Sequence, residues 1–511
     1  MSPRDLLRNP CWQGEDLGHP LPDSTHAVSV ALPRWRDVIA YEENDPQCRS
    51  QLRAFYPRFA LHPLVAEVAQ QALAMLPTEM CSTGSSAWPY PNAAAAQLAQ
   101  HHCQSQAPCA STQIVDQLGL SVLIANAEAS PHAKAFWQHA GLGASSRRAA
   151  ISLNKEAAPA AGSADQARAL VIERLAAIYG CDIQQLSLHP SGMAALHTAL
   201  QSVTALSPGR PTLQIGFPYV DVLKLPQVVF AGSELLLDSS SAAMEAALNR
   251  INPAAVIVEL PSNPLLQCVD LSTLSRLAHA RGIPVIADDT IGACLNIDPL
   301  PYADLIFSSL TKSFAGRGDV LSGALVVSPS SPWEQTFRDQ RSRAGCIGLG
   351  DADAMALEQG SRDVQARVPQ LNHHAQALAA QLSNHPAVAR VYYPDQCANF
   401  RNLMRPSGGH GCLLSFELKG GSDQAQAVYD RLAVCKGPSL GTPFTLVCPY
   451  VLLAHYDELP WAKACGVPSH LLRVSVGLEQ PEELWQRFER ALSASSFSRK
   501  RTRPTLSGSK A

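Results

Sequence analysis

A lysine stands in an unusual place in the stretch DLIFSSLTKSFAGRGDVLSGALVV, residues 304–327. Apolar segments flank it, and the glycine-rich loop that carries Lys312 is too open to hide an ammonium group. A lysine in a partly buried site loses its charge readily and becomes a nucleophile that forms Schiff bases with aldehydes. The simpler alternative is a lysine whose side chain extends to solvent from the end of a strand.

Three further strand ends carry polar residues. HPSGMAAL places Ser191 and Gly192 directly ahead of a helical segment, where free amides form an anion site, although plain capping is the alternative. VIADDT ends a strand with Asp288 and Asp289, which suit a metal, a helix cap or a buried cation. ELPSNPLL places Asn263 where an ordinary turn is the alternative. Because ligands bind at the carboxyl ends of strands in open α/β sheets, we expect these groups to meet.

Together these groups suit an aromatic aldehyde that carries a phosphate and a ring nitrogen. A helix N-terminus binds the phosphate, an aspartate pairs with the protonated ring nitrogen, and a lysine binds the aldehyde. In order and spacing, residues 165–492 resemble the Cys/Met-metabolism group of fold-type I pyridoxal-phosphate enzymes. The N-terminal segments HAVSVALPRWRDVIAYEENDPQCRSQLRAFYPRFALHP and FWQHAGLGASSRRAA resemble segments of the long fungal cystathionine γ-synthase-like branch. Two segments further along the chain, GFPYVDVLK and KGPSLGTPFTLVCPY, share this resemblance.

The resemblance implies pyridoxal 5'-phosphate as the cofactor, with Lys312 as the residue that binds it covalently. It assigns the ring nitrogen to Asp288 and the stacking on the ring to Tyr219, and these three are the expected catalytic residues. Where many relatives have Asp-Asn-Thr, this chain has Asp-Asp-Thr, which leaves the first acid in place. The other implied cofactor-binding residues are Ser191, Gly192, Met193, Asn263, Ser309, Thr311 and Arg147.

The expected substrate site lies in the C-terminal part of the chain. Arg473, in LLRVSVGLE, matches the arginine that binds the substrate α-carboxylate, a bidentate task suited to a guanidinium. Ser439, in PSLGT, matches the site beside that carboxylate, and we expect Asn263 to contribute as well.

One stretch departs from the family pattern. Many relatives donate a Tyr-x-Arg pair from a neighbouring subunit to the phosphate, just ahead of the first helix of the cofactor domain. The corresponding stretch here reads SSRR, so the tyrosine is missing and Arg147 is the expected phosphate arginine. YPRF, with Tyr56 and Arg58, is a rival source of the pair but lies far upstream.

The resemblance implies γ-replacement on an O-acyl-L-homoserine, in which an acyl group leaves and a vinylglycine-type intermediate takes up a nucleophile. Cysteine as the nucleophile gives cystathionine, and this is the leading hypothesis. A pathway-specific enzyme of secondary metabolism, which adds a carbon or other nucleophile to the same intermediate, is the alternative. A cystathionine lyase and a non-catalytic regulatory homologue are further alternatives. A regulatory homologue is expected to have lost Lys312, Asp288 or Arg473, but all three are present.

The elements that position these residues follow from the pattern of apolar runs. Helical segments at 170–180 and 192–203 alternate with strand-like runs such as AAVIVEL, PVIADD and DLIFSSL. Unbroken apolar strands separated by helices indicate a mostly parallel sheet covered on both faces. We therefore expect an α/β fold of the fold-type I transferase (aspartate-aminotransferase-like) class, with a large sheet of about seven strands and a smaller C-terminal α+β domain.

Changes in composition suggest four parts of the chain. We expect an N-terminal extension over 1–135, a large cofactor-binding domain with an inter-domain helix over 136–365, a small domain over 366–495 and a basic disordered tail over 496–511. A long helical stretch is predicted from about 351 to 383, and strands at GCLLSFEL, SLGTPFTLVCP and LLRVSVGL.

The bulk composition narrows the class of protein. The 511 residues carry 40 basic and 43 acidic side chains, so no strongly basic face for nucleic acid is expected. No apolar run has the length of about 20 residues that a membrane helix needs, which predicts a cytoplasmic protein. The 14 cysteines include no CxxC, and the cluster HHCQSQAPC is expected to be a surface loop rather than a metal site. By resemblance, the partners are an amino-acid substrate and further copies of the chain, in a homodimer or homotetramer.

Overall fold

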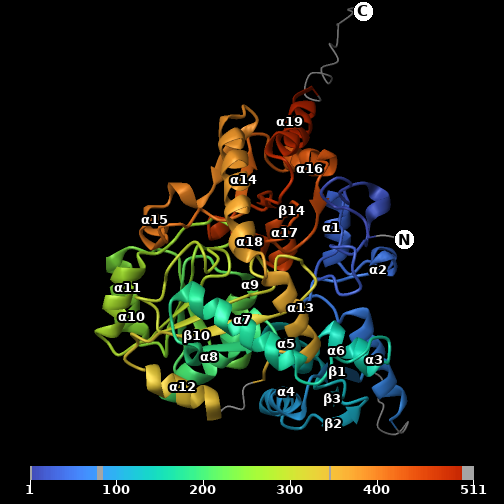
Figure 1. Ribbon diagram of the computed structural model, residues 1–511, viewed down its shortest axis with the longest axis vertical. Coiled ribbons are helices and arrows are strands. Elements are labelled where there is room, and N and C mark those ends of the chain that lie inside the picture. Colours follow the sequence, from blue (N-terminus) through green and yellow to red (C-terminus); the bar gives the residue numbers. More distant parts are fainter. Residues whose placement is uncertain (1–2, 77–83, 344–346, 498–511) are drawn as a thin grey trace, which may run out of the picture.

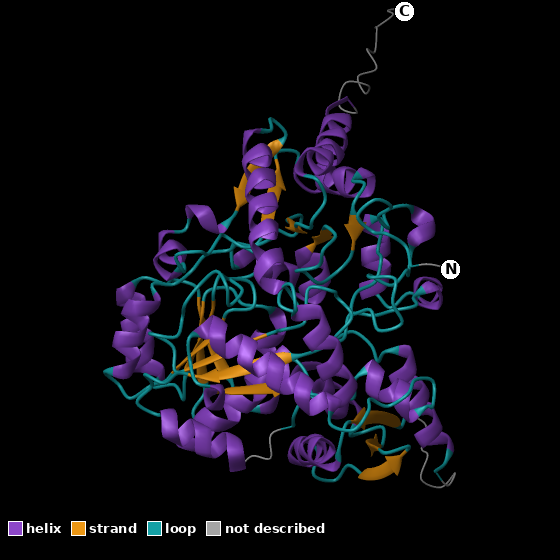
Figure 2. Cartoon of the chain, viewed as in Figure 1, coloured by secondary structure: helices purple, strands orange, loops and turns teal. Residues whose placement is uncertain are grey.

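The computed structural model describes residues 3–76, 84–343 and 347–497. Its secondary structure divides into a large α/β unit, a smaller α/β unit and an N-terminal region that contacts both (Figures 1 and 2). In Figure 1 the orange and red C-terminal elements form the upper part of the molecule, and the green and yellow elements of the large unit form the lower left.

The large unit is built on a seven-stranded sheet in the order β4-β10-β9-β8-β7-β5-β6. All strands run parallel except β10, which is antiparallel to both β9 and β4. The strands are β4 (Leu186–His189), β5 (Thr212–Ile215), β6 (Ser233–Leu236), β7 (Val256–Glu259), β8 (Val285–Asp288), β9 (Leu305–Ser308) and β10 (Gly323–Val327). This confirms the expected fold class.

Both faces of this sheet are buried, which explains the unbroken apolar runs in its strands. Side chains alternate across the sheet, so Val256 and Val258 pack in one hydrophobic cluster and Ile257 in another. The surrounding helices are α7 (Ser163–Tyr179), α8 (Gly192–Leu206), α9 (Val220–Val229), α10 (Ser241–Ile251), α11 (Leu271–His279), α12 (Glu334–Arg343) and α13 (Asp351–Ser361).

The smaller unit has a five-stranded sheet in the order β11-β12-β15-β14-β13. Its strands are β11 (Val388–Tyr392), β12 (Leu413–Leu418), β13 (Cys435–Lys436), β14 (Leu446–Pro449) and β15 (Leu472–Ser475). Its helices are α14 (Val364–Asn384), α15 (Ala398–Leu403), α16 (Gly421–Arg431), α17 (Tyr450–Ala454), α18 (Leu459–Ala464) and α19 (Pro481–Phe497).

The N-terminal region has two parts. Residues 3–62, which we call the strap, hold α1 (Trp35–Glu42) and α2 (Pro46–Gln51) beside the small unit. A three-stranded antiparallel sheet with helices follows and packs against the large unit. Its elements are α3 (Pro63–Ala74), β1 (Ser86–Tyr90), α4 (Ala93–Gln106), β2 (Thr112–Gln117), β3 (Leu120–Ala125), α5 (Ser130–Ala140) and α6 (Ser146–Ser152).

The strap bridges the two larger units through its backbone. The amide of Leu32 donates to the carbonyl of Lys436 in the small unit at 2.8 Å, and the Tyr429 hydroxyl donates back to the Leu32 carbonyl at 2.7 Å. The amide of Val28 donates to the carbonyl of Gly318, in the loop after Lys312, at 2.9 Å. The strap is therefore fixed on both sides of the cavity described below.

Three local predictions differ from the structure. The expected long helix is divided into α13 and α14 at residues 362–363. The run SLGTPFTLVCP is a strand only at its end, in β14, and the rest is a loop. The surface loop expected at HHCQSQAPC is wrong for its first half, because helix α4 continues to Gln106 and buries His102 and Cys103 against α5. The Asn92 cap and the alanine run that follows favour this helix.

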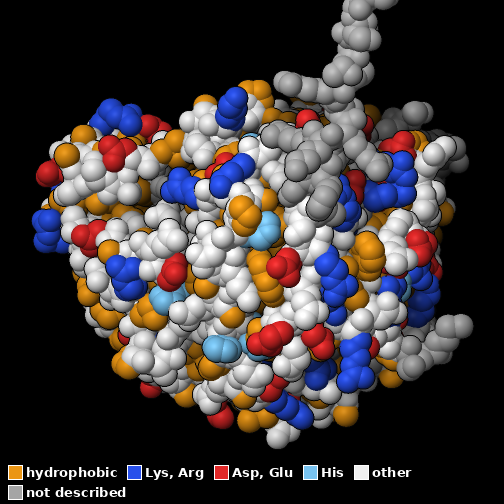
Figure 3. All heavy atoms as spheres, turned by 90° about the horizontal axis from the view of Figure 1, so that it is seen from above, with side chains coloured by type: hydrophobic (Ala, Val, Ile, Leu, Met, Phe, Trp, Pro, Cys, Tyr) orange, Lys and Arg blue, Asp and Glu red, His pale blue; other side chains and the backbone are white. Residues whose placement is uncertain are grey.

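The surface of the described residues carries both signs of charge. Basic and acidic side chains are interspersed on the face seen in Figure 3. Within the described ranges, no helix is long and apolar enough to cross a membrane, and no group of His, Cys, Asp or Glu could hold a metal ion. The predicted disordered tail lies almost wholly outside the described residues.

The close approach of β10 to the start of α8 gives the first prediction. A Cβ at Gly323 would lie 2.2 Å from the carbonyl oxygen of Ser191, which is backbone and cannot turn aside. We expect Gly323→Ala to lower the free energy of unfolding by about 2–3 kcal/mol through this overlap. The control is Gly348→Ala, where nothing lies within 4 Å, with a change of about 0.5 kcal/mol or less. Equal effects of the two substitutions in urea denaturation would contradict this account.

Candidate active site

Lys312 lines a cavity that encloses about 190 Å³. The side chain follows β9 and is only 9% exposed. Its Nζ donates to the hydroxyl of Tyr56 and to Oγ of Ser439, each at 3.1 Å, and lies 4.9 Å from the centre of the Tyr56 ring. The large unit, the small unit and the strap each supply one member of this group. Lys312 is therefore held inside the protein and does not extend to solvent.

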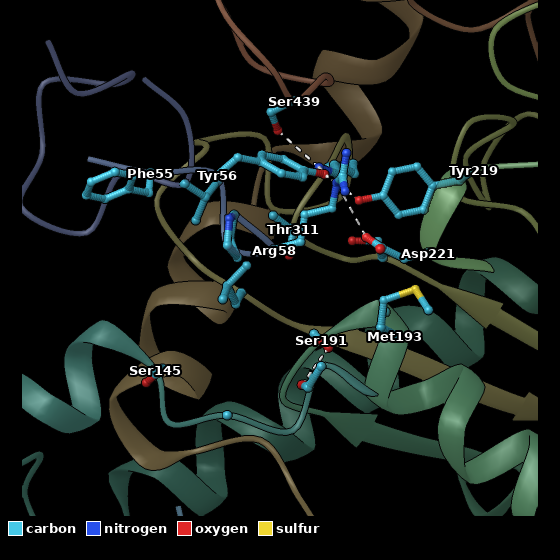
Figure 4. Close-up of a pocket in the computed structure, with 18 of the residues that line it drawn as sticks. Phe55, Tyr56, Arg58, Ser145, Ser191, Met193, Tyr219, Asp221, Thr311 and Ser439 are labelled. Atoms are coloured by element: carbon cyan, nitrogen blue, oxygen red, sulfur yellow. Dashed lines mark hydrogen bonds and ion pairs between the residues drawn. The ribbon is translucent and has the colours of Figure 1, made fainter. Parts of the chain in front are cut away.

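The N-terminus of α8 forms one end of the cavity, as Figure 4 shows for Ser191 and Met193. The Ser191 side chain accepts from the Ala194 amide at 3.0 Å and donates to the Gly141 carbonyl at 2.8 Å. No bond to the amides of Gly192 and Met193 is found among the described residues. These two amides and the positive end of the helix dipole suit a phosphate.

A Cβ on Gly192 would lie 2.8 Å from that of Ser309, so only glycine allows α8 to start this close to the strand end. The Ser309 amide donates to Oγ1 of Thr290 at 2.8 Å, which leaves the Ser309 side chain beside the helix N-terminus.

Asp288 and Glu259 are paired neighbours at the ends of β8 and β7, and both are buried. Burial raises the pKa of Asp288 to about 7, although bonds from Thr290 oppose the shift. Burial and the charge of Asp288 raise the pKa of Glu259 well above its usual range. The Glu259 carboxylate accepts from the amides of Asn263 at 2.9 Å and Tyr219 at 3.1 Å. Two buried acids side by side favour the binding of a cation beside Asp288 and Glu259.

Tyr219 and Tyr56 place their hydroxyls 3.4 Å apart beside Lys312. Burial opposes ionisation of Tyr56, but the positive charge of Lys312 and the hydrogen bonds with Tyr219 and Lys312 together outweigh it and lower the pKa of Tyr56. Burial and the charge of Asp221 raise the pKa of Tyr219. Arg58 lies 3.7 Å from the Asp221 carboxylate and lines the cavity (Figure 4).

Arg473 closes the small-unit side of the cavity. Its Nη2 donates to the Ser439 carbonyl at 2.8 Å, its Nη1 donates to Oδ1 of Asn263 at 3.4 Å, and its guanidinium packs over the ring of Tyr450. Ser439 adopts φ +88°, a rare conformation for a non-glycine residue. This turn directs the carbonyl of Ser439 to Arg473 and its hydroxyl to Lys312, which explains why the strain is kept at this position.

Two expected cofactor ligands are engaged elsewhere. Nη1 of Arg147 donates to the carbonyl of Asp319 at 2.5 Å, the guanidinium also pairs with the carboxylates of Asp319 and Asp353, and it does not line the cavity. The Thr311 hydroxyl lines the cavity but donates to the Ser322 carbonyl at 3.3 Å. The structure thus brings Arg58, and not Arg147, to the cavity wall.

Three site residues were missed or undervalued from the sequence. Tyr56 was considered only as part of a rival phosphate-binding pair, and its contact with Lys312 spans 256 positions. Glu259 ends a buried strand just as Asp288 does, so the strand-end rule could have found it. Asp221 follows Tyr219 closely in the sequence, but nothing there indicated its pairing with Arg58.

The cavity fits a phosphorylated pyridine aldehyde. Free amides at the start of α8 suit the phosphate, and the buried acid Asp288 suits a protonated ring nitrogen. Lys312 is the one lysine that lines the described cavity, and it suits the aldehyde.

Comparison with known proteins agrees with this fit. Residues 163–493 match the family described as Cys/Met metabolism PLP-dependent enzyme, and residues 64–145 match the N-terminal domain of fungal trans-sulfuration enzymes. The chain belongs to the Cys/Met metabolism PLP-dependent enzyme family. It is therefore an enzyme of the cystathionine γ-synthase-like kind, and its cofactor is pyridoxal 5'-phosphate.

Individual relatives in this family carry differing names. The chain is 31% identical to cystathionine γ-synthase of Neurospora crassa, over 93% of this chain and 98% of that protein. It is 34% identical to the L-2-amino-4-chloropent-4-enoate dechlorinase/desaturase of Streptantibioticus cattleyicolor, over 92% and 97%. A cystathionine γ-synthase of Xanthomonas oryzae pv. oryzae, solved with aminoacrylate and cysteine, has a TM-score of 0.58 and 27% identity over 65% of this chain and 87% of that chain.

The buried acid Asp288 gives a pH-dependent prediction for the apoprotein. Its pKa is about 7 in the folded chain and lower in the unfolded chain, so the folded state holds the proton more tightly. The stability of the folded state that comes from this proton is therefore lost as the pH rises from about 4 to about 7. Asparagine has no such proton, so we expect Asp288→Asn to gain stability over the wild type on going from pH 5 to pH 8.

Urea denaturation of the two apoproteins at both pH values measures this difference. Asp165→Asn, at an 85% exposed carboxylate, serves as the matched control. If the Asp288→Asn and wild-type profiles run parallel, the proposed burial of a protonated acid is wrong.

Proposed function

We propose that the protein catalyses replacement of the γ-substituent of an O-acyl-L-homoserine by an incoming nucleophile. The observation that carries this proposal is the position of Lys312 between Tyr56 and Ser439, with Arg473 on the far side of Ser439. An amino acid whose carboxylate binds Arg473 brings its α-carbon within the region that Lys312 can reach.

Each side chain then has a defined task. Asp288 pairs with the ring nitrogen of the cofactor, the amides of Gly192 and Met193 bind the phosphate, and Ser309 adds a hydroxyl beside them. When bound, pyridoxal phosphate supplies an electron sink that acidifies the substrate α-carbon. Arg58 is better placed for the phosphate than Arg147, because it lines the cavity. Tyr219 is proposed to stack on the cofactor ring.

Lys312 is the base that moves protons at Cα and Cβ of the substrate. Its Nζ donates a hydrogen bond to the Tyr56 hydroxyl, whose lowered pKa makes it a suitable proton partner. Asn263 and the Ser439 backbone hold Arg473 at the cavity wall, where its guanidinium is proposed to bind the substrate carboxylate.

The nucleophile is less constrained than the donor. The sequence predicts the cysteine thiol, and the cystathionine γ-synthase relatives support it. The relative named for dechlorination and desaturation, together with enzymes named cystathionine γ-synthase-like in Aspergillus thermomutatus and Amanita muscaria, supports a different partner at the same carbon. Both hypotheses share the loss of a γ-substituent.

Release of acetate from O-acetyl-L-homoserine tests the shared step. We expect purified holoenzyme to release acetate, and to give cystathionine with cysteine if cysteine is the acceptor, or 2-oxobutanoate and ammonia without one. Lys312→Ala should lose at least about 10³-fold in rate, because it removes both the cofactor attachment and the base. The exposed Lys134→Ala is the matched control and should keep the wild-type rate. No acetate from the wild type, or full turnover by Lys312→Ala, would contradict the proposal.

A further inference from the structure

Asp221 is a buried acid that has none of the tasks assigned above. It lies in the first turn of α9, lines the cavity and is 1% exposed. Burial opposes its ionisation, but the charge of Arg58 and the hydrogen bonds with His139 and Tyr219 outweigh burial and hold its pKa below the usual range. A charged carboxylate is costly to bury unless it is paired, so the partners of Asp221 indicate what it does.

The two carboxylate oxygens of Asp221 face different parts of the chain. Oδ1 lies 3.0 Å from Nδ1 of His139, in α5, which packs against α9. Oδ2 lies 3.7 Å from Nε of Arg58, in the strap. Figure 4 shows Tyr56 and Arg58 on one side of the cavity and Asp221 on the other. His139 thus fixes the carboxylate through one oxygen, and the other oxygen holds an arginine that arrives from the strap.

Arg58 has three neighbours that hold its guanidinium in place. Nε faces Asp221, Nη2 donates to the Leu453 carbonyl of the small unit at 2.8 Å, and the guanidinium carbon lies 4.3 Å from the centre of the Phe59 ring. Of these three neighbours only Asp221 carries a formal negative charge. No hydrogen bond of Nη1 is found among the residues that the structure describes, so this arm is left for an anion in the cavity.

A tight turn joins Arg58 to Tyr56. The Phe59 amide donates to the Tyr56 carbonyl at 3.0 Å, which closes a β-turn. Pro57 stands at the second position of this turn, where the fixed φ of proline is favourable. The side chains of Tyr56 and Arg58 are therefore coupled through a stiff backbone. The position of Arg58 fixes that of Tyr56, whose hydroxyl accepts from Nζ of Lys312 at 3.1 Å.

We infer that Asp221 is a positioning residue that holds Arg58, and through the turn also Tyr56, so that the strap brings both side chains to the cofactor site. This assignment rests on the proposed function, which gives Arg58 the phosphate and Lys312 the proton transfers. Without the carboxylate, a buried guanidinium lacks its counter-charge, and the turn moves away from Lys312 toward solvent. Asparagine has nearly the shape of aspartate but no charge, so Asp221→Asn isolates this effect.

Cofactor binding gives the first test, because it does not depend on turnover. Titration of the apoprotein with pyridoxal phosphate, followed by tryptophan fluorescence, measures Kd. We expect Asp221→Asn to raise Kd at least about tenfold in the wild-type background but less than about twofold in an Arg58→Gln background, because the arginine through which it acts is then absent. Asp165→Asn, at the 85% exposed carboxylate, is the matched control and should leave Kd unchanged. Equal effects of Asp221→Asn in both backgrounds would overturn the inference.

The rate of acetate release tests the coupling to Tyr56. With saturating pyridoxal phosphate and O-acetyl-L-homoserine, we expect Asp221→Asn to lower kcat about 10- to 100-fold, because the displaced Tyr56 hydroxyl no longer contacts Lys312. In a Tyr56→Phe background the same substitution should change kcat by less than about twofold. Losses that multiply in the double variant would contradict the coupling. If the wild type releases no acetate, the proposed function is wrong, while the comparison of Kd values still decides the role of Asp221 toward Arg58.

Hydrogen–deuterium exchange of the apoprotein reports on the strap itself. We expect Asp221→Asn to speed exchange at least about fivefold in peptides that contain residues 55–59, with peptides from α8 unchanged. His139→Ala is the second variant if Asp221→Asn does not fold, because it removes the partner of Oδ1 but keeps the carboxylate charge. It should speed exchange in the same peptides by a smaller factor. Unchanged exchange of residues 55–59 in a folded variant would contradict the inference.

Discussion

The hydrogen bonds from Lys312 to Tyr56 and Ser439 are the interactions on which the rest of the site depends. A 9% exposed ammonium is costly to bury unless polar groups surround it. Neither partner is local in sequence, so the large sheet, the small unit and the strap must all be in place before the lysine is satisfied. This one requirement explains why the strap crosses the boundary between the two larger units.

The buried acids that line the cavity differ in how their charge is compensated. Burial raises the pKa of both Asp288 and Glu259, and the charge of Asp288 adds to the shift of Glu259. A bound cofactor with a protonated ring nitrogen would offset the cost of burying an ionised carboxylate, so cofactor binding would also stabilise the fold. Asp221 behaves differently, because Arg58 and His139 keep its pKa low despite complete burial. A positively charged group of a ligand is therefore favoured beside Asp288 and Glu259, whereas Asp221 is already paired within the protein.

Much of the large unit could be predicted from the sequence, and the reasons are physical. Val256–Glu259 and Val285–Asp288 are short apolar runs with no polar face, as a doubly covered sheet requires. Lys312 and Asp288 were predicted as site residues because each follows or ends such a run, and Arg473 was predicted from the family resemblance; all three line the cavity. The strap was harder, because its role depends on contacts such as that of Leu32 with Lys436, which no local pattern encodes.

The choice of arginine for the cofactor phosphate shows a further limit of predicting site residues from their spacing in the sequence. Arg147 stands at the expected distance ahead of the first helix, but acidic side chains of residues 319 and 353 hold it. Arg58 lies far upstream and reaches the cavity only because the strap folds back. The end of helix α4 was also predicted wrongly as a surface loop, because its Gln and Ser residues are typical of loops. The Asn92 cap and the alanines at its start, which favour a helix, were given too little weight.

The central claim is that Lys312 is the residue that holds the cofactor. Treatment of the holoenzyme with sodium borohydride fixes the cofactor to its lysine, and peptide mapping by mass spectrometry then locates it. The account predicts a single phosphopyridoxyl group on the peptide that contains Lys312. A label on another lysine, or none on Lys312, would contradict it.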